Sequence, residues 1–215
     1  MKQDFTGMLK LGFILAMFSA ASCVMLAFVY SATSPIIAQR QQAALEAALK
    51  ELFPDADNFK LIEEIKSPDS AVTIESAYAA VKNNEITGAA LTLSRASYSG
   101  QIKTMVGVTS AGFISGVKIL EHSDTPGLGA NAASKKYFVD RANGITFYGQ
   151  FAGKKVTDPF AVKGDVIAIT ASTVTSNAVS SSVKAAGLAV EAWLSGEEPD
   201  VITSASVRTH GEDEK

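Results

Sequence analysis

The strongest constraint on the fold is the stretch from Leu11 to Gln39, which contains no Asp, Glu, Lys or Arg. Its apolar part continues to Tyr30, and this is close to the roughly 20 residues that an α-helix needs to cross the hydrocarbon core of a bilayer. We therefore expect a single transmembrane helix, with residues 1–34 forming an N-terminal membrane anchor.

The charges that flank this segment predict its orientation. Lys2 and Lys10 precede it, and Arg40 is the first basic residue after it. The positive-inside rule then favours a cytoplasmic N-terminus, so a single-pass protein of the cell (inner) membrane would place the rest of the chain on the periplasmic or extracellular side. A cleaved signal peptide is the alternative, because residues 20–23 resemble a lipoprotein cleavage site. The apolar run continues past Cys23, which favours the anchor.

Composition narrows the class of protein. Of the 215 residues, 47% are hydrophobic and 19% are charged, which suits one folded domain beyond the anchor. A net charge of −3, without a basic cluster after the N-terminus, argues against nucleic acid as a partner. Cys23 is the only cysteine, and the two histidines, His122 and His210, lack metal-ligand spacing. We therefore expect no metal site, and any redox chemistry must come from an organic cofactor.

Hydrophobic periodicity predicts an α+β fold. Helical spacing over residues 41–53 indicates a stalk helix, which Pro54 ends. Alternation of apolar and polar residues predicts three consecutive strands, and such strands favour an antiparallel meander. The predicted strands are residues 85–94, 101–109 and 113–122.

Further elements complete this prediction. We expect a helix over residues 131–142, a short buried strand over 166–169, and a helix that begins near residue 173. The predicted fold class is thus one transmembrane helix followed by a single domain, residues 35–200, with a mixed or antiparallel sheet and flanking helices. Residues 201–215 would form a polar tail.

A glycine-rich loop, HSDTPGLGAN, lies at residues 122–131. Pro and Gly residues are typical of an ordinary turn, and a nearby Asp or Asn is a common helix cap. The functional hypothesis is that Gly127 and Gly129 let the backbone lie against a planar ligand. Thr125 would then supply a hydroxyl and Leu128 an apolar wall.

A second unusual segment is ITASTVTSNAVSSSVKAAG, which begins at Ile169. Its hydroxyl residues could cap a helix whose apolar face is Val174, Ala178, Val179, Val183 and Ala186. One cap needs only one hydroxyl, however, and five in seven residues at a helix N-terminus are typical of a phosphate site. These five are Thr170, Ser172, Thr173, Thr175 and Ser176. A serine hydrolase is disfavoured, because the chain has no G-x-S-x-G motif.

The two segments, in this order, resemble the extracytoplasmic FMN-binding domain of the RnfG and NqrC subunits. In that family the loop reads close to E-T-P-G-L-G, and a motif near S-G-A-T-x-T-S carries a threonine to which FMN is joined through its phosphate. The resemblance implies covalent FMN at Thr173 and no catalytic residue. The other cofactor-binding residues that it implies are Asp124, Thr125, Gly127, Leu128, Gly129, Thr170, Ala171, Ser172, Thr175 and Ser176.

The chain departs from the family pattern at several positions. Asp124 replaces the loop glutamate, Thr170-Ala171-Ser172 replaces S-G-A, and an upstream aspartate is represented only by Asp165. Ala171 is the departure with the largest expected effect, because an alanine restricts the backbone where a positive φ is needed.

Over roughly residues 8–195 the chain looks most similar to RnfG. The resemblance implies an electron-carrying flavoprotein subunit of an ion-translocating ferredoxin:NAD oxidoreductase complex, without independent catalysis. Its partners would be the other membrane and iron–sulfur subunits, a flavin transferase and membrane lipid. Two alternatives remain at this point: an NqrC-like subunit of a sodium-pumping NADH:quinone reductase, and an anchored surface-binding domain without a cofactor.

Overall fold

The computed structural model describes residues 5–196, and it begins with one long helix, α1 (Phe5–Leu52). By length and composition, α1 is apolar and long enough to cross a membrane. The anchor helix and the stalk helix were predicted as separate elements, and this was wrong, because α1 runs through both. Pro35 lies inside the helix, where it cannot donate a backbone hydrogen bond. The predicted tail, residues 201–215, lies outside the described residues.

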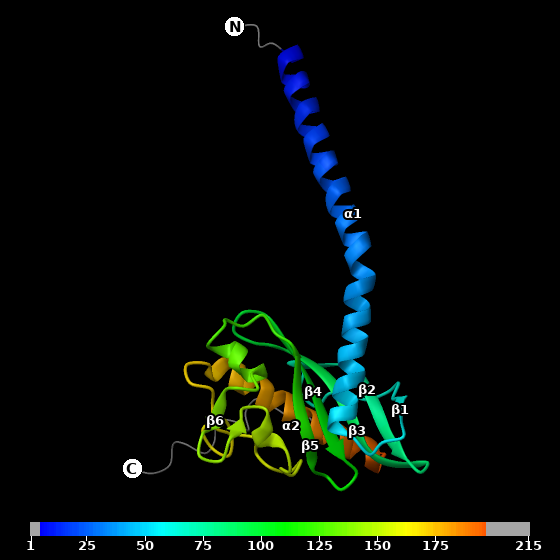
Figure 1. Ribbon diagram of the computed structural model, residues 1–215, viewed down its shortest axis with the longest axis vertical. Coiled ribbons are helices and arrows are strands. Elements are labelled where there is room, and N and C mark those ends of the chain that lie inside the picture. The colour runs from blue at the N-terminus through cyan, green and yellow to red at the C-terminus, as the bar shows by residue number, and fades with distance from the viewer. Residues whose placement is uncertain (1–4, 197–215) are drawn as a thin grey trace. The chain divides into compact units, whose positions relative to one another are not determined.

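The chain divides into two compact units, Met1–Leu45 and Glu46–Lys215. The second unit contains a five-stranded sheet in the order β1-β2-β3-β4-β5, and every neighbouring pair is antiparallel. The strands are β1 (Asn58–Leu61), β2 (Val72–Lys82), β3 (Glu85–Ala96), β4 (Gln101–Thr109) and β5 (Ile114–Glu121) (Figure 1). The α+β class and the meander are confirmed.

The first two strands of this sheet were not predicted. The second half of β2 contains AYAAV, and alanine has little intrinsic preference for strands. A stronger signal lies in the β2–β3 connection, where Asn83 and Asn84 have φ of 51° and 65°. Two consecutive residues with positive φ form the type I′ turn that matches the twist of a hairpin, and asparagine is favoured there.

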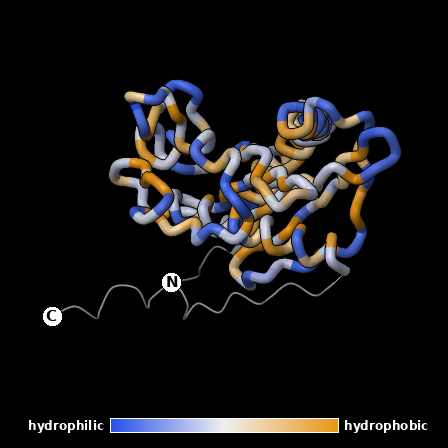
Figure 2. Tube along the Cα trace, turned by 90° about the horizontal axis from the view of Figure 1, so that it is seen from below, coloured by the Kyte–Doolittle hydropathy of each residue, from blue (hydrophilic) through white to orange (hydrophobic). Residues whose placement is uncertain are grey.

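One face of the sheet is covered by the second long helix, α2 (Thr173–Ser195), which runs behind the strands in Figure 1. Its buried Val179 and Val183 belong to the same core cluster as Leu91 of β3 and Val106 of β4. Ala178 and Ala186 are buried as predicted, but Val174 is 52% exposed, so its assignment to the core face was wrong. Hydrophilic residues gather at the connecting loops in Figure 2.

The opposite face of the sheet carries glycines where the end of α1 packs. A Cβ built on Gly88 would lie 2.8 Å from the Phe53 ring, and one built on Gly116 would lie 2.9 Å from Leu52. Gly107 is the register partner of Gly116 and faces both side chains. The absence of side chains at these three positions therefore seats Leu52 and Phe53, both 7% exposed, against the sheet.

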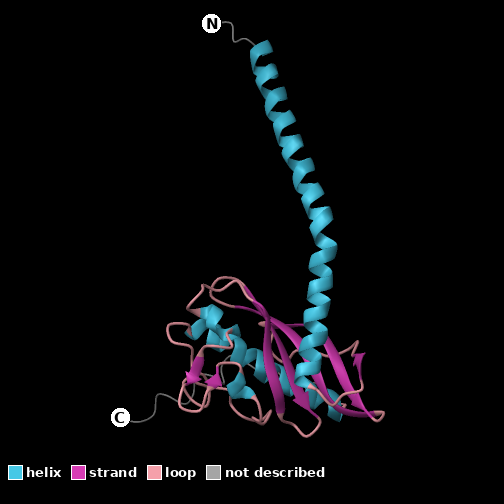
Figure 3. Cartoon of the chain, in the orientation of Figure 1, coloured by secondary structure: helices cyan, strands magenta, loops and turns pink. Residues whose placement is uncertain are grey.

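The stretch between β5 and α2 is mostly loop (Figure 3). Within it lie the 3₁₀ helices η1 (Gly129–Ala133) and η2 (Gly149–Phe151), and a two-stranded sheet of β6 (Phe138–Asp140) and β7 (Ile145–Thr146).

Two predictions for this stretch were wrong. The helix expected over 131–142 is limited to η1, because aromatic and β-branched residues follow and favour β6. Asp140 then closes a turn by accepting the amide of Ala142 at 3.1 Å. The strand expected over 166–169 is only an isolated bridge between Val162 and Val166, although Val166 and Ile169 are buried as expected.

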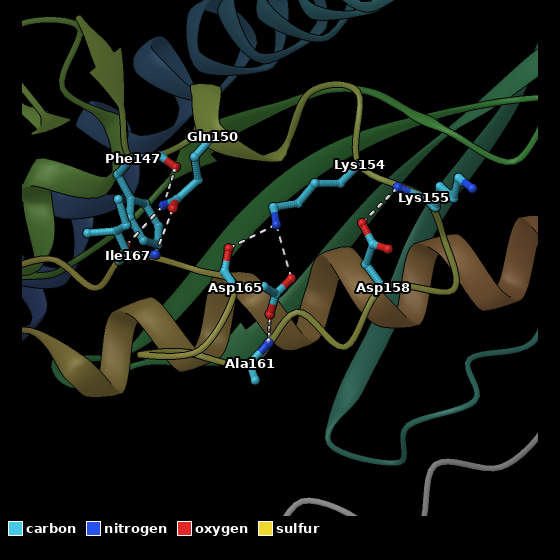
Figure 4. A network of polar contacts seen from close by, with 8 residues as sticks. All are labelled: Phe147, Gln150, Lys154, Lys155, Asp158, Ala161, Asp165 and Ile167. Atoms are coloured by element: carbon cyan, nitrogen blue, oxygen red, sulfur yellow. Dashed lines mark hydrogen bonds and ion pairs between the residues drawn. The ribbon is translucent and has the colours of Figure 1, made fainter. Parts of the chain in front are cut away.

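A lysine–aspartate pair fixes the loop that leads into α2 (Figure 4). Lys154 Nζ donates to the Asp165 carboxylate at 3.0 Å and to its carbonyl oxygen at 2.8 Å. Burial raises the pKa of Asp165, but the hydrogen bonds from Lys154 and the Ala161 amide outweigh it and hold the pKa below its ordinary value. Asp165 therefore has a structural partner and is not among the residues of the pocket described next.

Candidate functional site

Three segments that are distant in sequence enclose a partly open pocket of about 410 Å³. They are the β3–β4 turn, the loop after β5 and the start of α2. The lining residues are Tyr98, Asp124, Thr125, Leu128, Gly129, Ala171, Ser172, Thr173, Val174 and Thr175. The structure thus brings together most of the residues that the sequence singled out. Gly127, Thr170 and Ser176 do not line the pocket.

Asp124 joins the three segments. Its carboxylate accepts hydrogen bonds from Ser97 Oγ at 2.6 Å, from the Ser99 amide at 3.0 Å and from Thr175 Oγ1 at 2.8 Å. The residue is 6% exposed. Burial raises the pKa of Asp124, but these hydrogen bonds and the nearby His122 outweigh it, so the pKa lies below its ordinary value. Asp124 is therefore held as a charged group that ties the pocket walls together.

Glycine is required at positions 127 and 129 of the loop for two different physical reasons. Gly127 has φ of +81°, the left-handed region that a tight turn requires, and nothing lies within 4 Å of a Cβ built there. A Cβ on Gly129 would come within 2.6 Å of both Asp124 Oδ2 and Thr175 Oγ1. Gly129 is thus needed for close packing of the loop on the Asp124–Thr175 pair.

The hydroxyls at the start of α2 divide into two groups. Thr175 and Ser176 are fully buried and have partners in the protein. Thr175 binds Asp124, while Ser176 Oγ accepts the Ile169 amide and donates to the Ser172 carbonyl, both at 2.9 Å. Thr170 and Thr173 are exposed, and Thr173, the first residue of α2, lies at the pocket. Thr173 is therefore accessible to a modifying group.

Ala171 has φ of +57°. This is the left-handed conformation in which an alanine is strained and a glycine is not. The strained residue immediately precedes Ser172, the N-cap of α2, and so lies at the turn that brings Thr173 to the pocket.

Sequence reasoning missed two apolar residues of the site. Tyr98, in the β3–β4 turn, is 77% exposed, and Val174, assigned to the core face, is 52% exposed. With Leu128, which is 41% exposed, they leave apolar side chains in water around the pocket. Such an arrangement is typical of a ligand-binding site. No local pattern in the sequence indicates Tyr98, which reaches the pocket from the turn between β3 and β4.

The pocket has an unusual charge pattern. None of its lining residues is Lys or Arg, and Asp124 is the one charged residue among them. At one end lie the first turn of α2 and its hydroxyls, and apolar side chains form the remaining walls. The first-turn amides of a helix lack intrahelical partners and favour an anionic group. The arrangement suits a ligand with a flat apolar part and a phosphate.

The class of protein follows from a family comparison. The sequence model of the FMN-binding domain family matches residues 97–187, a range that contains every pocket-lining residue. The domain is an FMN-binding domain. The interpretation as a surface-binding domain without a cofactor is therefore not supported.

The RnfG N-terminal region matches residues 1–52. A relative from Clostridium ljungdahlii, the G subunit of the proton-translocating ferredoxin:NAD(+) oxidoreductase complex, is 32% identical over 180 residues, which cover 81% of this chain and 87% of the relative. The G subunit of the ion-translocating oxidoreductase complex of Aliivibrio fischeri is 31% identical, and the match covers 74% of this chain and 87% of the relative.

A third relative, from Acetobacterium woodii, is the G subunit of the Na(+)-translocating ferredoxin:NAD(+) oxidoreductase complex. It is 29% identical, and the match covers 84% of this chain and 90% of the relative. The chain belongs to this RnfG family, the G subunits of ion-translocating oxidoreductase complexes. With the apolar helix α1, this membership makes it a membrane protein, and it favours the RnfG interpretation over the NqrC-like one.

Proposed function

We propose that this chain is the electron-carrying subunit of an ion-translocating ferredoxin:NAD oxidoreductase complex, and that FMN is joined through its phosphate to Thr173. The observation that carries the proposal is the position of Thr173. It is exposed, begins α2 and lines the pocket inside the FMN-binding domain match.

The electrostatics of the pocket favour an ester over free FMN. A phosphate monoester carries about −1.5 to −2 charges at neutral pH, whereas a diester with Thr173 carries a single negative charge. The pocket lining supplies no cationic side chain and contains the Asp124 carboxylate. A helix N-terminus equivalent to about half a positive charge suits the smaller charge better. The covalent bond then supplies the retention that ion pairs would otherwise give.

The apolar walls would hold the ring system. Leu128 and Val174 are exposed at the pocket, and Tyr98 extends from the β3–β4 turn beside them. When bound, FMN accepts and donates electrons, and the protein sets its position and environment. Thr125, also in the lining, offers a hydroxyl at the edge of the ring. No acid or base from this chain is required for one-electron transfer.

The remaining partners follow from the same proposal. A flavin transferase would attach FMN, and α1 would cross the lipid bilayer once with the FMN domain on the periplasmic or extracellular side. Cys23 is the only cysteine, so this chain alone cannot carry a cysteine-bound iron–sulfur cluster. Other membrane and iron–sulfur subunits would therefore relay electrons to and from its flavin.

The covalent bond is tested with the full chain co-produced with a flavin transferase. The denatured protein should give a fluorescent flavin band on a gel. Thr173→Ala should lose this band, while Ser182→Ala, a buried serine elsewhere on α2, should keep it. An equal band from Thr173→Ala would disprove the attachment site, and the absence of a band from the parent chain would disprove covalent binding.

Sidedness needs a separate experiment. Lys135 is exposed, and Lys135→Cys in a Cys23→Ala background gives one thiol on the FMN domain. A membrane-impermeant maleimide should label it in intact cells whose outer barrier is permeabilised. Labelling only after lysis would place the domain in the cytoplasm.

A further inference from the structure

Ser172 is a buried hydroxyl residue whose side chain has no hydrogen-bond partner in the described part of the chain. It is 8% exposed and lines the pocket. It is also the N-cap of α2, a position at which a serine hydroxyl usually accepts a first-turn amide, yet it makes no such bond. Ser172 Oγ is not one of the fully enclosed hydroxyls of the described chain that lack a partner, so it can be reached from the pocket and is free to bond a ligand there.

We propose that Ser172 Oγ donates a hydrogen bond to the phosphate of FMN and makes the pocket selective for FMN over riboflavin. This inference rests on the proposed function, because it takes the pocket as the flavin site. It assigns Ser172 a binding role that is distinct from the role of Thr173, whose hydroxyl oxygen would become part of the phosphoester.

The other hydroxyls near the start of α2 are not available to donate to the phosphate. Thr175 already donates to Asp124, and Ser176 already donates to the Ser172 carbonyl. Thr170 is exposed and does not line the pocket. Ser172 is thus the largely buried lining residue at the start of α2 whose hydroxyl is able to donate.

The Ser172 hydroxyl is important because of the charges that the pocket lining lacks. With no Lys or Arg in the lining, the phosphate depends on neutral donors, namely first-turn amides and hydroxyls. A hydrogen bond to a charged group is stronger than one between neutral groups, and it disappears with riboflavin, which lacks the phosphate. The side chain therefore discriminates between the two flavins by a group that only one of them has.

The experiment uses the full chain in detergent, produced without a flavin transferase so that Thr173 is unmodified. FMN and riboflavin are each titrated, and binding is followed by flavin fluorescence. Ser172→Ala should weaken FMN binding by about tenfold or more, the effect of one hydrogen bond to a charged group, and leave riboflavin binding unchanged. Ser172→Thr, which keeps a hydroxyl, should restore most of the preference for FMN.

Ser182→Ala is the matched control, because Ser182 is a fully buried serine of the same helix that bonds the Ala178 carbonyl. It should change neither affinity. Equal weakening of FMN and riboflavin in Ser172→Ala, or no change in either, would overturn the role of Ser172 while leaving the pocket as a flavin site. Failure of the parent chain to bind either flavin would also overturn the role of Ser172 in selecting free FMN, whereas the covalent attachment at Thr173 is decided separately by the fluorescent band on the gel.

Discussion

The Asp124 carboxylate accepts a 2.8 Å hydrogen bond from the Thr175 hydroxyl, and this bond ties the loop after β5 to the first turn of α2. The two residues belong to different walls of the pocket that the FMN-binding domain match contains. The relationship explains why a carboxylate and a hydroxyl are needed at these positions even though neither has to touch the cofactor.

Asp124→Asn should destabilise the domain by about 1–3 kcal/mol, because an amide presents one acceptor oxygen where the carboxylate accepts from Ser97, Ser99 and Thr175. Unfolding by denaturant can be followed through Trp193, the single tryptophan, which packs on the core. A variant as stable as the parent would show that the three bonds contribute no net stability.

The parent chain and Asp124→Asn should also differ in their pH dependence. The pKa of Asp124 is lower in the folded state than its ordinary value, so its charged form stabilises the fold above about pH 4, and this contribution is lost as the pH falls through the folded-state pKa. The difference in unfolding free energy between the two should thus be constant near neutrality and shrink below about pH 4. A difference that grows on acidification would contradict this sign.

Ala171→Gly should stabilise the domain by about 0.5–1 kcal/mol, because glycine adopts the φ of +57° without strain and the gain exceeds its larger unfolded-state entropy. Ala152→Gly is the matched control. Ala152 is also exposed but has φ of −61°, so its replacement should lower stability. Loss of stability in both variants would show that Ala171 is not strained.

Gly88→Ala should destabilise the domain by about 1–3 kcal/mol, because its Cβ would contact the Val108 carbonyl oxygen and the Phe53 ring. Gly116→Ala should cost less, since its added Cβ meets only the end of the flexible Leu52 side chain. Denaturant unfolding measures both. The reverse order would mean that the backbone of β3 and β4 adapts more easily than Leu52.

Leu128→Ala should shift the absorbance or the potential of the flavin without releasing it, because it removes an apolar wall but leaves the attachment at Thr173. Leu61→Ala on β1 is a suitable control, since Leu61 is even more exposed, at 61%, and does not line the pocket. Unchanged spectra and potential in Leu128→Ala would mean that the loop acts only as a turn.

Short sequence patterns correctly predicted the strands and loops that depend mainly on local residues. Alternation of apolar residues located β3, β4 and β5, and turn and hydroxyl residues located the two loops that meet at the pocket. The early part of the sheet was missed because AYAAV in β2 becomes a strand through its neighbours rather than its own preference. The helix predicted over residues 131–142 was wrong because the charged and apolar residues there have helical spacing although most of the segment is not helical.

The sequence predicted most of the residues of the site, but it did not predict which of them bind the cofactor and which stabilise the fold. Thr175 and Ser176 were grouped with Thr173 as hydroxyls for phosphate, and only their burial and partners show that they stabilise the fold. Tyr98 reaches the pocket through the β3–β4 turn, which no local pattern indicates. The strain at Ala171, in contrast, follows directly from the replacement of a glycine, and the observed φ agrees with it.

The most direct test of the central claim is peptide mass spectrometry of the full chain after co-production with a flavin transferase. The account predicts a mass increase of one FMN ester on the peptide that contains the start of α2, with fragment ions that place it on Thr173. The same FMN ester on Thr170, Ser172 or Thr175, with Thr173 unmodified, would contradict it.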